Sequence, residues 1–217
     1  MSHDSSPHDS SREKLLAAAR LLFSTRGFDA TTVKELSDEA GVNVSLVSYH
    51  FGGKDGLYRA CLEQFGRERL DVARKMLQPP KSAEEIFIRL RMFAEEMFRC
   101  HVDESELTQI IHRECELGLP LAEDIFKETF MEVFGSMVEF WRVARERKLI
   151  RPELDPQTLA GIFFGVVMHT AKSERINVKF YKQSISDEAY RNRVLDHIER
   201  TVIRGALMEN SSGERAK

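Results

Sequence analysis

Apolar residues recur at helical spacing, every three or four positions, along almost the whole chain. The pattern begins near Ser10 and continues to Met208. No segment shows the sustained alternation of apolar and polar residues that a half-buried strand requires. The sequence therefore predicts an all-α fold of about nine helices.

Length and charge limit the number of domains and the classes of function. The 217 residues suffice for one large domain or two small ones. Lys and Arg number 32 and Asp and Glu number 35, which leaves a formal net charge of −3. This balance excludes a protein held to nucleic acid by bulk basicity, so any DNA binding must come from a local surface.

The cysteines and the ends of the chain indicate an ordinary intracellular protein. Cys61, Cys100 and Cys115 form no CxxC pair, so neither a disulfide framework nor a structural zinc site is expected. No stretch reaches the roughly 18 apolar residues of a membrane helix. The first residues lack the basic segment and apolar run of a secretory signal. We expect a reduced, cytoplasmic protein without membrane contact, bound metal or cofactor.

Capping signals mark where several helices begin. In a capping box, a Ser or Thr and a Glu three residues later satisfy backbone N–H groups at the helix start. Such boxes begin at Ser10, Thr32 and Ser82, and Pro120 and Pro156 suit first helical positions. The predicted helices cover residues 10–27, 32–40, 44–51, 54–77, 82–99, 104–117, 120–147, 156–174 and 187–208.

The second and third predicted helices have the spacing of a helix-turn-helix, with about eight residues, a turn of about three and another short helix. Asn43 is placed to cap the third helix. In that helix Val47 and Phe51, four residues apart, can face the core. This geometry predicts that the third helix presents its other side to solvent.

The solvent side of the third helix carries hydrogen-bonding groups on Ser45, Ser48 and Tyr49. No acidic residue occurs between Gly41 and Lys54. A phosphate-binding surface must lack carboxylates locally, because repulsion acts within a Debye length of about 8 to 10 Å. The segment therefore suits DNA even though the whole chain is slightly acidic. The alternative is an ordinary solvated helix face.

Three segments carry a family resemblance. They are REKLLAAARLLFSTRGFDATTV at residues 12–33, AGVN at 40–43 and YHFGGKDGLY at 49–58. Together they closely resemble the TetR/AcrR family of bacterial transcription regulators. Beyond residue 60 only the number and order of the helices agree. The resemblance implies a helix-turn-helix DNA-binding domain (11–55) and a helical effector-binding and dimerisation domain (56–208). The segments outside them, 1–10 and 209–217, are expected to be disordered tails.

The resemblance also implies DNA-binding roles at matching positions. Thr32, Tyr49 and Lys54 correspond to phosphate contacts, and the exposed face of helix 44–51 corresponds to the base reader. Many family members carry Lys near the start of this helix, so Val44 is a departure. Gly56 is unusual inside a helix, where it costs about 1 kcal/mol relative to Ala. The expected DNA-binding residues are Thr32, Val44, Ser45, Ser48, Tyr49, His50 and Lys54.

In the second domain, the resemblance implies an effector cavity, whereas aromatic residues at helical spacing are first of all core residues. His112 and Glu116 share a helix face and are candidate polar anchors for a ligand; with Cys115, Cys100 and His101 they are also a weaker metal-binding alternative. The expected pocket residues are Phe93, Met97, His112, Glu116, Phe130, Phe134, Met137, Trp141, Phe164 and Met168.

Helix 156–174 is apolar on nearly all sides and so needs two packing partners, which we expect to be its own core and a sister subunit. The resemblance likewise implies that helices 156–174 and 187–208 pair across a dimer. The expected interface residues are Leu159, Ile162, Phe163, Val166, Val194, Ile198 and Val202.

These features predict a homodimeric repressor that binds palindromic double-stranded operator DNA and is released by a small-molecule effector. A DNA-binding protein controlled by a protein partner or a nucleotide is the alternative. The sequence contains no GxSxG, HExxH, P-loop or GxGxxG motif, so an enzyme is not expected.

Overall fold

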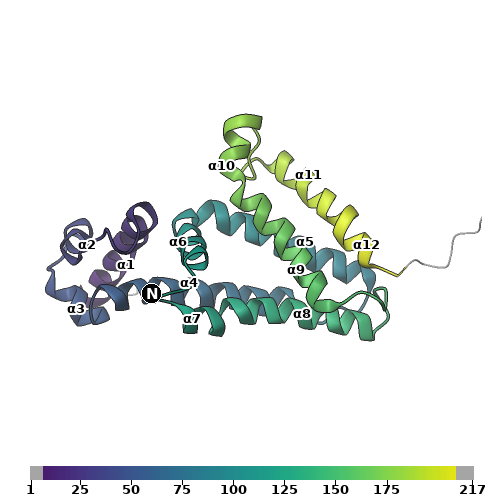
Figure 1. Cartoon of the computed structure of the whole chain (residues 1–217), viewed down its shortest axis with the longest axis horizontal. Coiled ribbons are helices and arrows are strands. Elements are labelled where there is room, and N and C mark those ends of the chain that lie inside the picture. The colour runs from purple at the N-terminus through teal and green to yellow at the C-terminus, as the bar shows by residue number, and fades with distance from the viewer. Residues whose placement is uncertain (1–6, 209–217) are drawn as a thin grey trace, which may run out of the picture. The chain divides into compact units, whose positions relative to one another are not determined.

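A computed structural model describes residues 7–208, with side chains from Ser10 onward. This part of the chain is helical apart from turns and one isolated antiparallel bridge between Ile150 and Leu207. The predicted all-α class is therefore confirmed. The chain divides into two compact units. Figure 1 labels their helices. Unit 1 comprises residues up to Leu70 and Glu104–Met131, and unit 2 comprises Asp71–Asp103 and the residues from Glu132 onward.

Unit 1 contains the N-terminal helices and two later short ones. Its core includes Leu15, Ala19 and Phe23 of the first helix, which the sequence assigns to a buried stripe and which are at most 1% exposed. The first helix packs on the second, the third and α6. The helices of unit 1 are α1 (Pro7–Arg26), α2 (Val33–Ala40), α3 (Ser45–Phe51), the first part of α4 (Lys54–Met76), α6 (Ser105–Glu116) and α7 (Glu123–Glu128).

Helix α1 begins earlier than the sequence predicts. It starts at Pro7 rather than at Ser10, because a proline fits the first helical turn, where its missing N–H has no helical partner to lose. The predicted capping box at Ser10 therefore lies inside the helix, and the expected disordered tail is wrong for residues 7–10. Residues 1–6 and 209–217, the rest of the two predicted tails, lie outside the described residues.

The predicted helix 120–147 is interrupted. It separates into α7 and α8 (Phe130–Glu146), and Thr129 between them has φ −122° and ψ −71°. Thr129 is buried, and its hydroxyl donates a hydrogen bond to the Ile125 carbonyl at 2.6 Å. A Cβ on Gly66 of α4 would lie 2.4 Å from the Thr129 hydroxyl oxygen. Close packing of Thr129 on α4 thus accompanies a break that the apolar pattern does not reveal.

Unit 2 is organised around α5. Helices α9 and α11 both pack on it, through the Phe93 and Phe163 rings, whose centroids are 6.4 Å apart, and through an ion pair of 2.6 Å between Arg91 and Asp196. Its helices are the end of α4, α5 (Ala83–Asp103), α8, α9 (Pro156–Lys172), α10 (Glu174–Ile176), α11 (Glu188–Ile198) and α12 (Arg204–Ala206).

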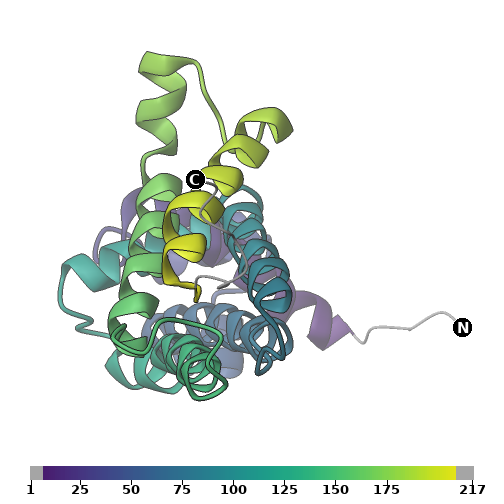
Figure 2. The same ribbon diagram turned by 90° about the vertical axis from the view of Figure 1, so that its right-hand side faces the viewer.

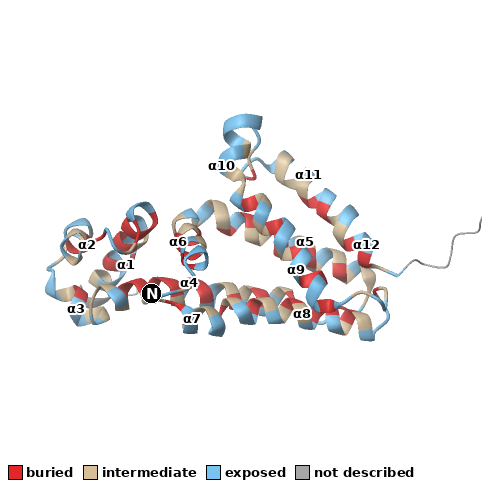
Figure 3. Ribbon diagram, viewed as in Figure 1, coloured by how far each residue is buried: buried red, intermediate tan, exposed pale blue. Residues whose placement is uncertain are grey.

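Two π-helical turns in unit 2 are absent from the sequence prediction. The first, Asn177–Tyr181, follows α10 and extends the helical segment beyond residue 174, where the sequence predicts that helix 156–174 ends. The second, Glu199–Ile203, interrupts the predicted helix 187–208. Phe180 and Tyr181 in the first turn are each 67% exposed. Figure 2 draws this turn in light green, and Figure 3 colours it mostly pale blue for exposed. A segment without a buried stripe gives no amphipathic signal, so the periodicity does not reveal it.

The domain boundary predicted after residue 55 has no counterpart in the helices, since α4 runs without interruption from Lys54 to Met76. The compact units instead group α6 and α7 with α1 to α3. The predicted functional division of the chain stays a prediction. No helix between residues 7 and 208 is long and apolar enough to cross a membrane.

Candidate nucleic-acid interface

Helices α2 and α3 form the predicted helix-turn-helix. The Thr32 side chain and Glu35 make the expected capping box at the start of α2. Gly41 ends α2 with φ 63°, the left-handed conformation that glycine adopts without strain. Leu36 and Val47 are completely buried and anchor one side of each helix in unit 1.

The opposite side of α3 is exposed. Val44 is 50% and Tyr49 is 71% exposed, and Ser45 and Ser48 also face solvent. The Asn43 carboxamide oxygen accepts hydrogen bonds from the Ser45 backbone N–H at 2.9 Å and the Ser45 hydroxyl at 2.8 Å, which confirms the predicted capping by Asn43. The Ser45 oxygen retains its capacity to accept a hydrogen bond. Val44 at the N-cap of α3 and Ser45, Ser48 and Tyr49 within it are thus all accessible to DNA.

Lys54 has a structural role that the sequence does not reveal. Its ammonium donates hydrogen bonds of 3.0 Å to the carbonyl oxygens of Phe28 and Thr31 and lies 4.1 Å from the centre of the Phe28 ring. These contacts tie the start of α4 to the α1–α2 connection. One N–H of the ammonium remains for a phosphate, so the expected DNA contact stays a prediction.

Thr32 is similarly engaged at the start of α2. Its backbone N–H and its hydroxyl each donate to Glu35 Oε2 at 2.8 Å, and Glu35 also pairs with Arg26 at 2.8 Å. The hydrogen bond from the Thr32 backbone is the largest cause of a lowered Glu35 pKa. A carboxylate therefore already occupies the α2 N-terminus, and a phosphate at Thr32 must share these donors with it.

The N-terminal part of α1 contacts the end of α3. Ser11 Oγ lies 3.3 Å from His50 Nε2, and the Arg12 guanidinium lies 5.4 Å from the centre of the Phe51 ring. His50 is half-buried, so its ring lies against α1 rather than standing free on the recognition surface. Arg12 precedes the two helices of the helix-turn-helix in the sequence, and no local spacing predicts its contact with α3.

A buried polar pair joins α4 to α6 within unit 1. The Tyr58 hydroxyl donates to Glu114 Oε1 at 2.6 Å, and both residues are buried. Burial and the neighbouring carboxylate raise the pKa of Tyr58. The Leu121 backbone N–H, at 3.4 Å, also donates to Glu114. The two partners are 56 positions apart, so no sequence pattern links them.

The residues expected to line an effector pocket are divided between the two units. In unit 2, the Phe164 ring contacts those of Phe93 and Phe134, each with centroids 5.8 Å apart. Trp141 is fully buried, and its indole nitrogen has no hydrogen-bond partner. Met137 is also fully buried, and Met97 and Met168 are half-buried.

The other expected pocket residues belong to unit 1, where Glu116 is exposed and His112 and Phe130 are half-buried. Within residues 7–208, no group of three His, Cys, Asp or Glu side chains could hold one metal ion, a result that covers the candidate set around His112 and Cys115.

The residues expected at a dimer interface differ in exposure. Leu159, Phe163 and Ile198 are at most 6% exposed within one chain, so these three side chains belong to the core of unit 2. Ile162 and Val166 are 48% and 37% exposed, and Val194 and Val202 are half-buried. The surface available to a partner is thus narrower than the sequence predicts.

Comparisons with known proteins agree with the helix-turn-helix geometry. Residues 15–61 match the family model described as bacterial regulatory proteins, tetR family. The HTH-type transcriptional regulator RutR of Escherichia coli (strain K12) is 24% identical over 200 residues, which are 89% of each protein. The HTH-type transcriptional repressor BepR of Brucella suis biovar 1 (strain 1330) is 26% identical over 162 residues, 72% of this chain and 76% of BepR.

A solved structure shows the same fold. SmeT, the repressor of the Stenotrophomonas maltophilia multidrug efflux pump SmeDEF, superposes with a TM-score of 0.68 at 17% identity, over 92% of this chain and 91% of SmeT. These relatives are transcriptional regulators rather than enzymes. The matched N-terminal segment, the relatives and the helix-turn-helix assign this chain to the TetR family, as a DNA-binding transcriptional regulator.

Proposed function

We propose that this regulator is a homodimeric repressor that binds a near-palindromic operator and releases it when a small molecule binds among its C-terminal helices. The observation that carries the proposal is the exposed face of α3, with Val44, Ser48 and Tyr49 accessible and no acidic residue from Gly41 to Lys54. Its relatives BepR and SmeT are named as repressors. A bacterial operator also implies a cytoplasmic location.

Each exposed side chain of α3 suits a particular DNA contact. The hydroxyls of Ser45 and Ser48 can donate to or accept from base edges in the major groove, and the Val44 methyl groups can contact a thymine methyl. The Tyr49 hydroxyl can donate to a phosphate, which positions the protein without reading sequence.

Dimerisation is supported by the outer face of α9. Ile162 and Val166 are exposed there, and Gly161 and Gly165 lie beside them. A Cβ added at either glycine would meet nothing within 4 Å, so a helix from a second subunit can approach closely. Such a dimer would place two α3 helices in successive major grooves, about 34 to 36 Å apart.

The apolar interior of unit 2 supports the effector part of the proposal. The indole N–H of Trp141 lacks an acceptor in fully buried surroundings, which is costly for a polar group. A ligand with a carbonyl or ether oxygen near Trp141 would satisfy this donor, while rings such as Phe93 and Phe164 would cover its apolar part.

Selection of bound fragments from genomic DNA is the test of the proposed operator function. Variants of α3 should then affect binding of the selected operator in two ways. Ser48→Ala and Val44→Ala should alter the base preference, with changes of about 1–3 kcal/mol in binding free energy at particular base pairs. Tyr49→Phe should weaken binding to all DNA sequences by a similar factor. Ser186→Ala, at an exposed serine of unit 2, is the control. Equal effects of Ser48→Ala and Ser186→Ala would remove α3 as the base reader.

The dimer and the effector need separate measurements. Val166→Asp should give monomers by analytical ultracentrifugation and weaken operator binding, while Ile88→Asp, at a 50% exposed residue of α5, should leave the dimer intact. An intact Val166→Asp dimer contradicts the interface assignment.

For the effector, compounds that release the operator should bind Trp141→Phe more weakly. Release only by a protein partner or a nucleotide would contradict the small-molecule proposal.

A further inference from the structure

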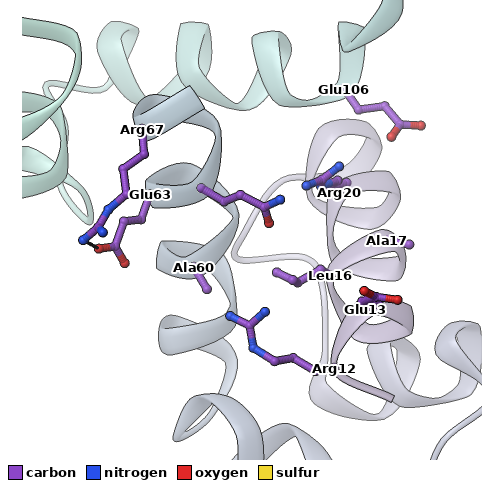
Figure 4. Close-up of a pocket in the computed structure, with 10 residues that line it drawn as sticks. Arg12, Glu13, Leu16, Ala17, Arg20, Ala60, Glu63, Arg67 and Glu106 are labelled. Atoms are coloured by element: carbon purple, nitrogen blue, oxygen red, sulfur yellow. Dashed lines mark hydrogen bonds and ion pairs between the residues drawn. The ribbon is translucent and has the colours of Figure 1, made fainter. Parts of the chain in front are cut away.

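A cleft in unit 1, separate from the apolar interior of unit 2, has the features of a ligand site. Its volume is about 710 Å³, and it lies between α1, α4 and the Glu106 side chain of α6 (Figure 4). This volume falls within the range of about 300–1,000 Å³ that holds small organic ligands. None of the residues expected from the sequence to bind an effector or DNA lines it.

Two arginines of α1 give the cleft an unsatisfied positive charge. Arg12 and Arg20 stand eight residues apart and line the same cleft, with Leu16 between them (Figure 4). The Nε atom of Arg20 is buried and has no hydrogen-bond partner. Among the side chains described from Ser10 to Met208, neither arginine has an ion-pair partner within 4 Å. A buried guanidinium N–H without an acceptor is costly, and an anion would relieve that cost.

The third arginine of the cleft is already neutralised. Arg67 pairs with Glu63 at 2.5 Å along α4, and Figure 4 shows this pair directed away from α1. Arg12 and Arg20 are therefore the groups available to an incoming carboxylate, which a guanidinium can bind through two parallel hydrogen bonds.

The carboxylates of the cleft restrict which anion fits. Glu13 of α1 and Glu106 of α6 also line it, so a polyanion such as a DNA backbone would be repelled there. A small ligand avoids this repulsion if it combines one carboxylate with hydrogen-bond donors. The carboxylate would face the arginines, and hydroxyl or amino groups would face Glu13 or Glu106. Leu16 and Ala60 supply an apolar floor for the ligand's carbon atoms.

We propose that this cleft binds a small organic carboxylate that carries hydroxyl or amino groups, with Arg20 as the principal anchor and Arg12 as the second. The ligand bridges α1 and α4. Arg12 also lies over the Phe51 ring at the end of α3. A ligand bound to Arg12 is therefore connected through this side chain to the recognition helix. Binding itself does not depend on the proposed operator or dimer, so it can be measured without DNA.

Thermal unfolding and titration calorimetry of the full chain test the proposal. The probes are malate, gluconate, glutamate and serine, with the matching amides and inorganic phosphate for comparison. We expect at least one of the four carboxylates, but not its amide, to raise the melting temperature and bind at a single site. Arg20→Met should weaken that binding roughly 10- to 100-fold, the usual effect of losing a charge-assisted hydrogen-bonded pair.

Two further variants distinguish a ligand site from a structural arginine. The double variant Glu63→Gln/Arg67→Met, which removes the neutral pair as a whole, should retain carboxylate binding within about twofold, since Arg67 and Glu63 pair with each other. Ala17→Phe, at an exposed lining residue, should block binding without changing charge. Arg20→Met should leave the ligand-free melting temperature unchanged or raise it, because it removes an unsatisfied buried donor.

Several results would overturn the proposal. These are the absence of protection by all four carboxylates, equal protection by the amides or by phosphate, and unchanged carboxylate binding in Arg20→Met. A ligand-free Arg20→Met chain that no longer folds would identify Arg20 as structural; Ala17→Phe would then decide, and carboxylate binding that survives in Ala17→Phe would refute the site.

Discussion

Replacement of Gly56 by alanine should destabilise the protein, although alanine is normally the better residue in a helix. Gly56 lies in the first turn of α4, just after the recognition helix α3. A Cβ at this position would lie 1.7 Å from the Phe51 carbonyl oxygen and 2.9 Å from the Phe51 carbonyl carbon. The obstacle is backbone, so it cannot rotate away as a flexible side chain would.

The size of the effect follows from two opposing contributions. Alanine in place of glycine gains up to about 1 kcal/mol of helix propensity. To reach a tolerable 3.0 Å contact, the Phe51 carbonyl must retreat by more than an ångström, and such overpacking costs about 1–3 kcal/mol or more. We expect a net loss of about 1–2 kcal/mol in the free energy of unfolding, or roughly 2–8 °C in melting temperature for a chain of this size.

Gly135→Ala is the matched control. Gly135 is also helical, within α8, but a Cβ there would meet nothing within 4 Å. This substitution should therefore stabilise the protein by about 0.5–1 kcal/mol. Urea and thermal unfolding of both variants measure whether each substitution lowers or raises the free energy of unfolding. Operator affinity should fall for Gly56→Ala, because the displaced carbonyl belongs to the last residue of α3.

Stabilisation by both substitutions would refute the reasoning, since it would mean that α3 and α4 separate without cost. A destabilised Gly56→Ala variant with unchanged operator affinity would show that the strain is absorbed in α4 and does not reach the recognition helix.

Three other predictions concern polar contacts of unit 1. Tyr58→Phe should lower the free energy of unfolding by about 1–3 kcal/mol, because it leaves the buried Glu114 carboxylate with only a weak backbone donor; Glu114→Gln, which keeps an acceptor, should cost less in urea unfolding. Lys54→Ala should destabilise unit 1 and also lower the slope of log affinity against log salt by about 0.9; an unchanged slope with lower stability would leave Lys54 a structural role only. The hydrogen bond from Arg59 lowers the pKa of Asp124 to about 2. Because this folded-state pKa lies below the ordinary 3.8, the carboxylate stabilises the folded chain above about pH 4 and loses that contribution as the pH falls toward 2. The stability gap between wild type and Asp124→Asn should therefore shrink over that range, and a gap independent of pH would contradict the pairing.

The local signals of the sequence were most reliable where they depended on adjacent residues. The capping box at Thr32 and the cap at Asn43 appear as expected, because each involves atoms only two or three residues apart. The helix start at Ser10 and the unbroken helix across Thr129 were wrong. In both cases the local pattern is compatible with a helix that begins or ends at a different residue. At Thr129 the deciding contact is with Gly66, a residue far away in the chain.

The sequence by itself determined the all-α class, the helix-turn-helix and the exposed polar face of α3, because hydrophobic periodicity and capping act within a few residues. Only the tertiary structure decided what the polar side chains do. It directs the Lys54 ammonium to the carbonyl oxygens of Phe28 and Thr31. It also shows why a glycine stands at position 56 inside a helix, since the Phe51 carbonyl leaves no room for a Cβ. Finally, it leaves Arg20 with a buried N–H that has no hydrogen-bond partner in a cleft. These outcomes depend on which helices pack together, and that packing joins atoms whose separation in the sequence carries no periodic signal.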